Sequence, residues 1–444
     1  MVLFLIIFNI IILTTAVFFY LQQFLQLQRI LSIVTSFVIV IQTTSLFFSI
    51  TLFTGISFVY FIFPWSILSY FIFYFSLRTK HYNPTKIKWS SAGTVILMAL
   101  ITYGCARFVF YSARWGEWDA WAIWNLHAKF LTYDNNWNNY LTNEISWTHP
   151  DYPLFLSSLI ALFWKAGGEI NPVVPATIAM IFFLSTLLIS GFTFFGRFTP
   201  IIRIITVFSL VINTSFISIF AAQYSDGLLA FIFLLSFIYL KKLDTPGQPS
   251  KLFLITGFIA ASPIWIKNEG ISFFLIFSLY VFIRYFKLKK SLLQYIIGTI
   301  PIVLTLLLFK FFYAPPNDLI AENQAGTLLE KLTDTERYLM IIENIANSVY
   351  RKYPLIIFFI FIMILFYNKK RISRDFLIVI LMLLIYIGVY IMTPHNLQWH
   401  LATSLDRLLL HIFPSFTFLF MYNINKLISE KEINNLKLKS YSEI

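Results

Sequence analysis

The chain has 444 residues, of which 59% are hydrophobic, 19% aromatic and only 12% charged, and its mean hydropathy is +0.77. A soluble protein of this length carries roughly a quarter charged residues, so the composition excludes an ordinary soluble domain and indicates a polytopic membrane protein. The net charge of +13 comes largely from Lys and Arg clusters between apolar segments, which is how orientation in a membrane is encoded, so it does not indicate nucleic-acid binding.

The hydropathy pattern predicts an all-α polytopic fold. The first apolar segment has no basic start and no small-residue cleavage site, so we expect a retained span rather than a signal peptide. The single cysteine, Cys105, excludes an internal disulfide. Because a spanning helix needs about 20 apolar residues, we expect about thirteen spans, namely 2–22, 30–53, 57–76, 91–113, 172–195, 201–221, 225–241, 252–267, 270–286, 292–313, 354–367, 376–393 and 404–424.

The spans group into four regions. We expect N-terminal transmembrane helices (1–90), a transmembrane core with a large loop at 114–153 (91–313), a second external loop (314–353), and C-terminal transmembrane helices with a cytoplasmic tail (354–444). Basic clusters place five loops on the cytoplasmic side with this tail, namely 77–90, the loop of Arg197 and Arg203, 241–251, 284–290 and 368–374. This assignment requires that 154–166, only 13 residues long, does not cross and forms a partly inserted helix.

The opposite side then carries the acidic and histidine-bearing segments: 114–153, 223–226, 267–269, 314–353 and 393–406. Six of the eleven tryptophans fall in 114–153, four of them at every third residue. Tryptophan prefers the boundary between hydrocarbon and water, so we expect this loop to carry short helices on the membrane surface, half buried. Its carboxylates and histidines are Glu117, Asp119, Asp134, Glu144, Asp151, His127 and His149.

Asp119 and Glu117 are the candidate catalytic residues. A carboxylate at a water–hydrocarbon boundary has a raised pKa and a fixed position, which suits a general base. With helical spacing Asp119 shares a face with Ile123 and Leu126, while Glu117 points elsewhere. The structural alternative is an acidic helix start, because acids favour the first turn of a helix.

Three further groups are candidate substrate-binding residues. His149, Asp151 and Tyr152 belong to the turn 149–153, in which two prolines bracket Asp151 and Tyr152, and in the structural alternative Asp151 is a helix cap. Asp226 lies at the external mouth of a span, where it could equally be an N-cap. Lys267 could contact a phosphate and Glu269 a sugar hydroxyl, or the two could form a simple ion pair within a turn.

The last candidate substrate-binding residues are His395 and His400, in the last external segment, and Arg407, which follows it. Arg407 lies inside what we expect to be the final span, where a cation needs a partner. A phosphate suits the planar guanidinium. The structural alternative is an internal pair of Arg407 with Asp406 or Glu269.

The sequence lacks the motifs of several other enzyme classes. It contains no GxxxxGK[ST], no GxGxxG opening a helix after a strand, and no HExxH, so it gives no case for nucleotide binding or a zincin site. The carboxylates and histidines could hold a divalent metal, but no spacing is diagnostic, and no cofactor or metal ligand is assigned.

Carboxylates, Lys and Arg gathered on one membrane face suit glycosyl transfer from a lipid-linked phosphosugar. A polyprenyl tail holds the donor in the bilayer, an acceptor hydroxyl attacks the anomeric carbon, a carboxylate takes the proton, and cations stabilise the leaving phosphate. The partners are a polyprenyl-phosphate sugar, a lipid, glycan or protein acceptor, and membrane lipids. The enzyme is expected in the inner (plasma) membrane, with its site on the extracytoplasmic side.

At these residues the chain resembles the bacterial GT-C membrane glycosyltransferases, in particular the protein mannosyltransferase and aminoarabinose transferase group. The resemblance rests on Glu117-Trp118-Asp119, the 149–153 turn and Asp226, and it covers roughly 91–270. It implies a GT-C fold, a polyprenyl-phosphate donor and Asp119 as the base. In two respects the chain departs from the family: a Trp separates the two acids, and three spans precede the one leading into the loop.

Two other functions stay open. A polymerase or ligase of lipid-linked glycans also has external loops but commonly relies on Arg and His, whereas acids outnumber basic residues in 114–153. A transporter or flippase places its charged site near the bilayer midplane on broken helices, whereas most ionisable residues of this chain are expected at a surface.

Overall fold

The computed structural model describes residues 1–77, 91–133, 135–193, 198–317, 325–365 and 373–442. Asp134, Arg197, most of the predicted loop 77–90 and the cluster 369–371 lie outside these residues. Within them the chain is helical and forms no β-strand.

The first half of the fold runs from α1 to α10, with two short irregular helices, η1 and η2, in the long loop. The elements are α1 (Val2–Leu25), α2 (Arg29–Thr54), α3 (Phe58–Leu77), α4 (Ala92–Tyr111), η1 (Ala120–Trp124), α5 (Asn125–Leu131), η2 (Asn143–Thr148), α6 (Phe155–Gly167), α7 (Val173–Phe192), α8 (Pro200–Val211), α9 (Thr214–Ala221) and α10 (Ser225–Leu243). The second half has α11 (Lys251–Ile266), α12 (Glu269–Arg284), α13 (Lys289–Phe312), α15 (Ala325–Thr333), α16 (Thr335–Lys352), α17 (Pro354–Leu365), α18 (Phe376–Met392) and α19 (Leu397–Ser442).

The helices support a membrane-embedded protein with fewer clear spans than predicted. Among the described residues six helices are long and apolar enough to cross a membrane, or eight if each of two bent pairs counts as one span. The predicted count of thirteen is therefore not confirmed. The predicted span 201–221 is two helices, α8 and α9, bent by 62°, and α17 leaves α16 at 98°. Helices α11, α12 and α18 have only 16 or 17 residues.

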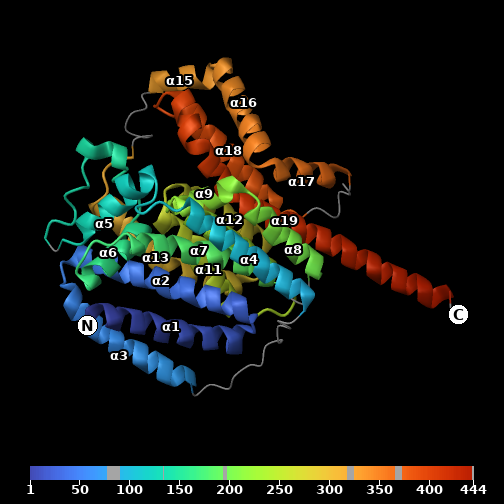
Figure 1. Cartoon of the computed structure of the whole chain (residues 1–444), viewed down its shortest axis with the longest axis horizontal. Helices are drawn as coiled ribbons and strands as arrows, with labels where there is room; N and C mark the ends of the chain where they lie inside the picture. Colours follow the sequence, from blue (N-terminus) through green and yellow to red (C-terminus); the bar gives the residue numbers. More distant parts are fainter. Residues whose placement is uncertain (78–90, 134, 194–197, 318–324, 366–372, 443–444) are drawn as a thin grey trace.

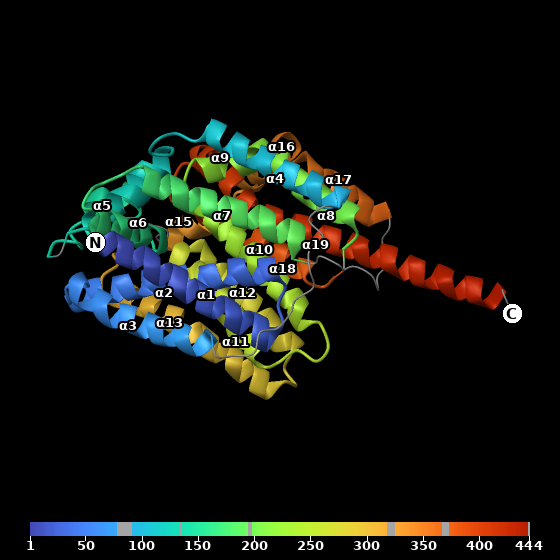
Figure 2. The ribbon, with the colours of Figure 1, turned by 60° about the horizontal axis from the view of Figure 1, so that its bottom comes forward.

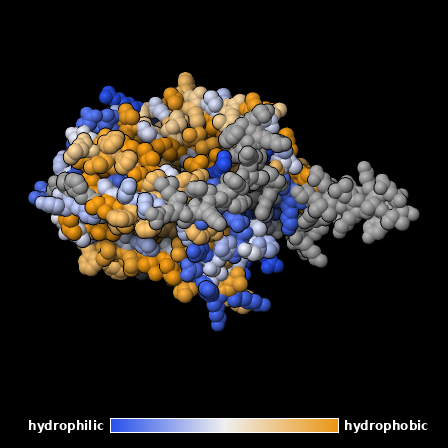
Figure 3. Space-filling model, turned by 90° about the horizontal axis from the view of Figure 1, so that it is seen from below, coloured by the Kyte–Doolittle hydropathy of each residue, from blue (hydrophilic) through white to orange (hydrophobic). Residues whose placement is uncertain are grey.

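Figures 1 and 2 show an elongated bundle with two distinct ends. One end carries the N-terminus and residues 112–154, and we call it the loop end. At the other end, the tail end, the C-terminal part of α19 extends beyond the bundle. In Figure 3, hydrophobic residues form a broad area over the described part of this face, and hydrophilic ones gather mainly along its edges. This distribution is the one expected of a protein surrounded by lipid.

Helix α10 is the centre of the bundle. Every one of its residues except Lys242 is buried, and it packs against α7, α11 and α19. Helix α6, which the sequence predicted not to cross, has 13 residues and packs against α5, α2 and α1. At 1.5 Å per residue it is about 20 Å long, too short for a hydrocarbon core of about 30 Å.

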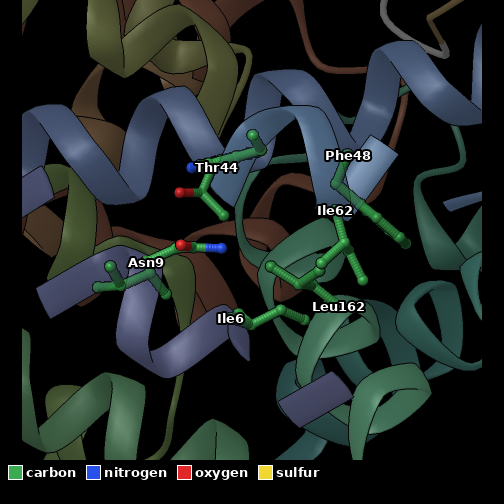
Figure 4. Close-up of a pocket in the computed structure, with 8 residues that line it drawn as sticks. Ile6, Asn9, Thr44, Phe48, Ile62 and Leu162 are labelled. Atoms are coloured by element: carbon green, nitrogen blue, oxygen red, sulfur yellow. The ribbon is translucent and has the colours of Figure 1, made fainter. Parts of the chain in front are cut away.

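The N-terminal helices α1, α2 and α3 pack against one another, and α1 and α2 also pack against α6. A narrow cavity of about 20 Å³ lies between these four helices. In Figure 4, the side chains of Asn9 and Thr44 lie near one another, beside the apolar Ile6, Ile62 and Leu162. The space is about that of one water molecule, so this cavity is too small for a sugar or a lipid.

Candidate functional site at the loop end

The long loop forms short helices, as predicted, and the described part of it contains η1, α5 and η2, but much of it is buried. Helix α4 ends at Tyr111 and α6 begins at Phe155, close to the predicted loop boundaries. The side chains of Trp124, Trp137 and Tyr140 are almost fully buried, and Trp137 packs on Phe53 and Tyr313. The expected half-buried surface loop is therefore partly a component of the core.

Asp119 and Arg407 form an ion pair across 288 positions of the sequence. Asp119 directly precedes the π-helix η1, and Arg407 lies in α19. The predicted alternative partners of Arg407 are wrong: Asp406 pairs with Lys352 of α16, and Glu269 pairs with Lys267. The structure therefore brings the candidate base and the candidate phosphate-binding cation into direct contact.

Tyr224 lies beside this pair. The guanidinium carbon of Arg407 is 5.4 Å from the centre of the Tyr224 ring. Burial, together with the negative charge of Asp119, raises the pKa of Tyr224 to about 12, so its hydroxyl stays protonated. A protonated phenol at this place is a hydrogen-bond donor.

Asp226 is the most deeply buried acid of the site, with 0% exposure of its side chain. It is not the N-cap of α10, which is Tyr224. One carboxylate oxygen lies 2.9 Å from Lys267 Nζ and 2.9 Å from His411 Nε2. Its other oxygen has no protein partner among the described residues. Because a buried charge is costly, Asp226 depends on these partners.

Lys267 and His411 extend the cluster. Lys267 Nζ lies 3.0 Å from Glu269, so the predicted turn pair exists, but Lys267 also binds Asp226. The other ring nitrogen of His411 is 3.0 Å from the Tyr386 hydroxyl. Arg407 interacts electrostatically with Asp226. We call this cluster the loop-end network: Asp119, Asp226, Lys267, Glu269, Arg407 and His411.

Asp151 points to a neighbouring polar cluster instead of capping α6, so the predicted cap is wrong. The N-cap of α6 is Leu154. The Asp151 carboxylate accepts a 2.7 Å hydrogen bond from Asn268 and lies 3.3 Å from Lys310 Nζ. Lys310 also donates to Asn268, at 2.9 Å. Asp151 therefore joins the 149–153 turn to α13 and to the α11–α12 connection.

Tyr152 links this turn to the loop-end network. Its ring stacks on His149 with a centroid separation of 4.8 Å and on Trp124 at 5.6 Å. Lys267 Nζ is 5.7 Å from the ring centre. Burial and the nearby carboxylates raise the pKa of Tyr152 well above its ordinary value. The Tyr152 hydroxyl is therefore neutral beside the charged loop-end network.

The remaining predicted residues lie apart from the network. His395 and His400 have ring centroids 5.8 Å apart, and His400 Nδ1 is 2.8 Å from the Thr393 hydroxyl. They form a group at the α18–α19 junction. Glu117 is exposed, and its backbone N–H donates to the Ala222 carbonyl. Among the described residues its carboxylate forms no hydrogen bond or ion pair.

His411 and Lys310 were not predicted as site residues. His411 follows Arg407 by four positions on α19, so helical spacing places both on one face. This spacing alone could have identified His411 as a candidate site residue from the sequence. Lys310 is a single cation near the end of an apolar segment, and only its contacts with Asp151 give it a place here. Among the residues that the structure describes, no group of three or more His, Cys, Asp or Glu side chains is arranged to hold a metal ion.

A second ionic cluster lies at the tail end. Lys241 of α10 pairs with Asp375, beside the N-terminus of α18, and donates to Ser373 at 2.7 Å. Arg284 of α12 lies 2.7 Å from Asp244. Helix α10 thus has one charged cluster at each of its ends.

Comparisons with protein-family models, with curated proteins and with solved structures gave no match.

Proposed function

We propose that this chain is an integral-membrane glycosyltransferase that moves a sugar from a polyprenyl-phosphate donor to a hydroxyl acceptor. The observation that carries the proposal is the contact between Asp119 of the first loop and Arg407 of α19, beside the buried Lys267–Asp226 pair. A carboxylate and two cations at one end of a membrane bundle supply a general base and a binding site for an anionic leaving group.

In the proposed reaction the acceptor oxygen attacks the anomeric carbon of the donor sugar. The new carbon–oxygen bond forms as the bond from that carbon to the phosphate oxygen breaks, and the polyprenyl phosphate leaves with the electron pair. Asp119 takes the proton of the acceptor hydroxyl. Arg407 and Lys267 stabilise the leaving phosphate, and Arg407 does so with two parallel N–H donors.

The resting ion pair adds a step to this mechanism. Asp119 cannot act as a free base while its carboxylate is held by Arg407. A donor phosphate competes for the same guanidinium, and when it binds it releases Asp119 toward the acceptor. Base activation then depends on the presence of donor, which limits unproductive hydrolysis.

A groove at the loop end suits the lipid part of such a donor. It has a volume of about 560 Å³ and lies between the end of α4 and the start of α7. Its walls include the apolar Val109, Ile170 and Val173, and Arg114 and Glu169 stand among its lining residues. An open groove that combines apolar walls with polar and charged residues suits the part of an isoprenoid phosphate where the lipid joins the anion.

The test uses purified protein in lipid nanodiscs. Binding of a short polyprenyl phosphate should be lost in Arg407→Leu and remain impaired in Arg407→Lys, which keeps the charge and loses the two-pronged donor. Transfer from a radiolabelled polyprenyl-phosphate sugar should fall about 10²- to 10⁴-fold in Asp119→Asn, and less in Glu117→Gln.

Lys352→Met is the matched control, because it breaks the separate pair with Asp406 and should leave binding and transfer unchanged. Wild-type affinity for the polyprenyl phosphate in folded Arg407→Leu would contradict the phosphate site. An active Asp119→Asn with an inactive Glu117→Gln would assign the base to Glu117.

A transporter is the second candidate, favoured by one observation. Helix α10 has a charged cluster at each end. An alternating-access transporter needs an outer and an inner gate, and the two clusters stand where such gates would lie. Proteoliposomes that move a polyprenyl-phosphate sugar between leaflets without transferring the sugar would favour this function over glycosyl transfer.

A further inference from the structure

Three of the loop tryptophans form an exposed aromatic surface. The side chains of Trp118, Trp121 and Trp147 are 55%, 46% and 52% exposed. Trp118 lies against Trp121 with ring centroids 4.6 Å apart at 74°, and against Trp147 at 6.2 Å. Trp147 belongs to η2, far along the loop from the other two. Two separate segments therefore converge to build this group, which we call the tryptophan platform.

The other loop tryptophans are used differently. Trp124 stacks on Tyr152, Trp137 packs on Phe53, and Trp115 meets Trp164 of α6 edge to face. These rings are held by protein contacts, so they contribute to the fold. Trp118, Trp121 and Trp147 stay exposed, so the protein forgoes the free energy that burying these three rings would give. An exposed apolar group of this kind indicates an external partner.

The surroundings of the platform argue against a hydrocarbon partner. Glu117 directly precedes Trp118, is itself exposed, and its carboxylate forms no hydrogen bond or ion pair within the described part of the chain. Arg114 is also exposed. A carboxylate beside lipid chains is costly, so a partner that combines an apolar face with hydroxyl donors fits better. A pyranose ring has this chemistry: its C–H face packs on an indole, and its hydroxyls donate to a carboxylate.

Asp119 lies between two platform residues, Trp118 and Trp121, on the same short segment. We propose that the tryptophan platform binds the saccharide part of the acceptor, so that the acceptor is a carbohydrate or glycolipid. This inference rests on the proposed function, because it places the acceptor beside the proposed base. The platform supplies affinity and orientation, while Asp119 supplies the proton transfer.

Saturation-transfer NMR on the full-length protein in nanodiscs tests the platform without any transfer reaction. The probes are cellotriose, chitotriose and mannotriose. We expect saturation of the ring C–H protons of at least one probe, and an affinity about tenfold weaker in Trp147→Ala, since losing one stacked ring removes about 1.4 kcal/mol. Tyr133→Ala is the matched control, because Tyr133 is a 46% exposed aromatic of the same loop outside the platform.

Two results would overturn the inference. One is the absence of saturation with all three probes, or equal saturation in wild type and Trp147→Ala. The other is quenching of Trp147 fluorescence by acyl-brominated lipids, read as the difference between wild type and Trp147→Phe, which would make lipid the occupant. Sugar binding without transfer would leave the platform standing and reject the glycosyltransferase. Sugar transfer without platform-dependent binding would support the glycosyltransferase and reject the tryptophan platform as the acceptor site.

Discussion

At the scale of single residues, the loop-end network depends on mutual neutralisation. Asp226 is fully buried and Lys267 nearly so. Desolvation of either charge costs several kcal/mol, and the attraction between them offsets this cost only while both are present. A buried pair of this kind is weak evidence for stability as such, but it makes each member sensitive to loss of the other.

Lys267→Met should destabilise the protein by about 3 to 5 kcal/mol, because it removes the ion-pair partner of Asp226 and leaves His411 as the hydrogen-bond partner of this buried carboxylate. The double variant Asp226→Asn with Lys267→Met should recover most of this loss. Chemical unfolding in mixed micelles measures both. Lys352→Met is the control, since Lys352 is 47% exposed and such pairs contribute less than about 1 kcal/mol. Equal losses of unfolding free energy in Lys267→Met and Lys352→Met would contradict the assignment of Lys267 as the buried partner of Asp226.

His127 gives a prediction for pH. Burial lowers the pKa of His127 to about 3, with a smaller contribution from His149, while Asp151 and Thr148 act in the opposite direction. The unfolded chain binds a proton near pH 6.5 and the folded chain does not. The contribution of His127 to stability is therefore fully present above about pH 6.5 and is lost as the pH falls toward about 3.

Between pH 7 and pH 5 the free energy of unfolding should fall by about 2 kcal/mol through His127 alone. His127→Gln carries no titrating group, so its unfolding should lack this part of the pH dependence. Parallel unfolding curves at both pH values give the difference directly. Identical pH dependence in the two proteins would show that His127 titrates normally in the folded state.

At the scale of elements, α11 and α13 approach closely through glycine. A Cβ on Gly257 would stand 2.1 Å from the Tyr295 carbonyl oxygen, and a Cβ on Gly298 would stand 2.0 Å from that of Leu254. No side chain fits at these distances. Small residues are a common way for helices to pack within a membrane, where lipid removes the hydrophobic driving force between them.

Gly257→Ala should therefore separate α11 from α13 and cost about 3 kcal/mol or abolish folding. Gly388→Ala is the matched control, because nothing lies within 4 Å of its added Cβ, and alanine is the better helix former by about 1 kcal/mol. Thermal unfolding followed by size-exclusion chromatography compares the two. A Gly257→Ala protein as stable as wild type would mean that the helices are not held at this distance.

At the scale of the whole molecule, the charged groups separate into two ends. The loop-end network connects the first loop, the α11–α12 connection and α19, while the tail-end cluster connects α10, α12 and the start of α18. The basic loops predicted for the cytoplasm include 241–251 and 284–290, and α10 and α12 carry these loops at the tail end. This separation favours a single orientation in the membrane.

Cysteines introduced at Asn136 and Gln248, in a Cys105→Ser background, test the orientation. A membrane-impermeant maleimide applied to sealed right-side-out vesicles should label Asn136→Cys only, and permeabilisation should make Gln248→Cys reactive. Labelling of Gln248→Cys alone in sealed vesicles would invert the topology, and it would move the proposed site to the cytoplasmic face.

Composition and local pattern were enough to predict the all-helical membrane class, the loop between α4 and α6, and the short α6. These features depend on solvent and on near neighbours in the chain: a run of apolar residues is helical in lipid whatever it packs against. The span count was less predictable, because hydropathy does not register the 62° bend between α8 and α9.

The partnerships of the site were decided by tertiary structure alone. Asp119 and Arg407 are 288 residues apart, Asp226 and His411 are 185 apart, and no local pattern selects these pairs. Each charge must find an opposite charge before it can be buried, and several candidates were available to each. Packing of α10 against α11 and α19 settles which of them meet. The sequence by itself therefore determined which residues are charged near the membrane, and the fold decided which of them neutralise one another.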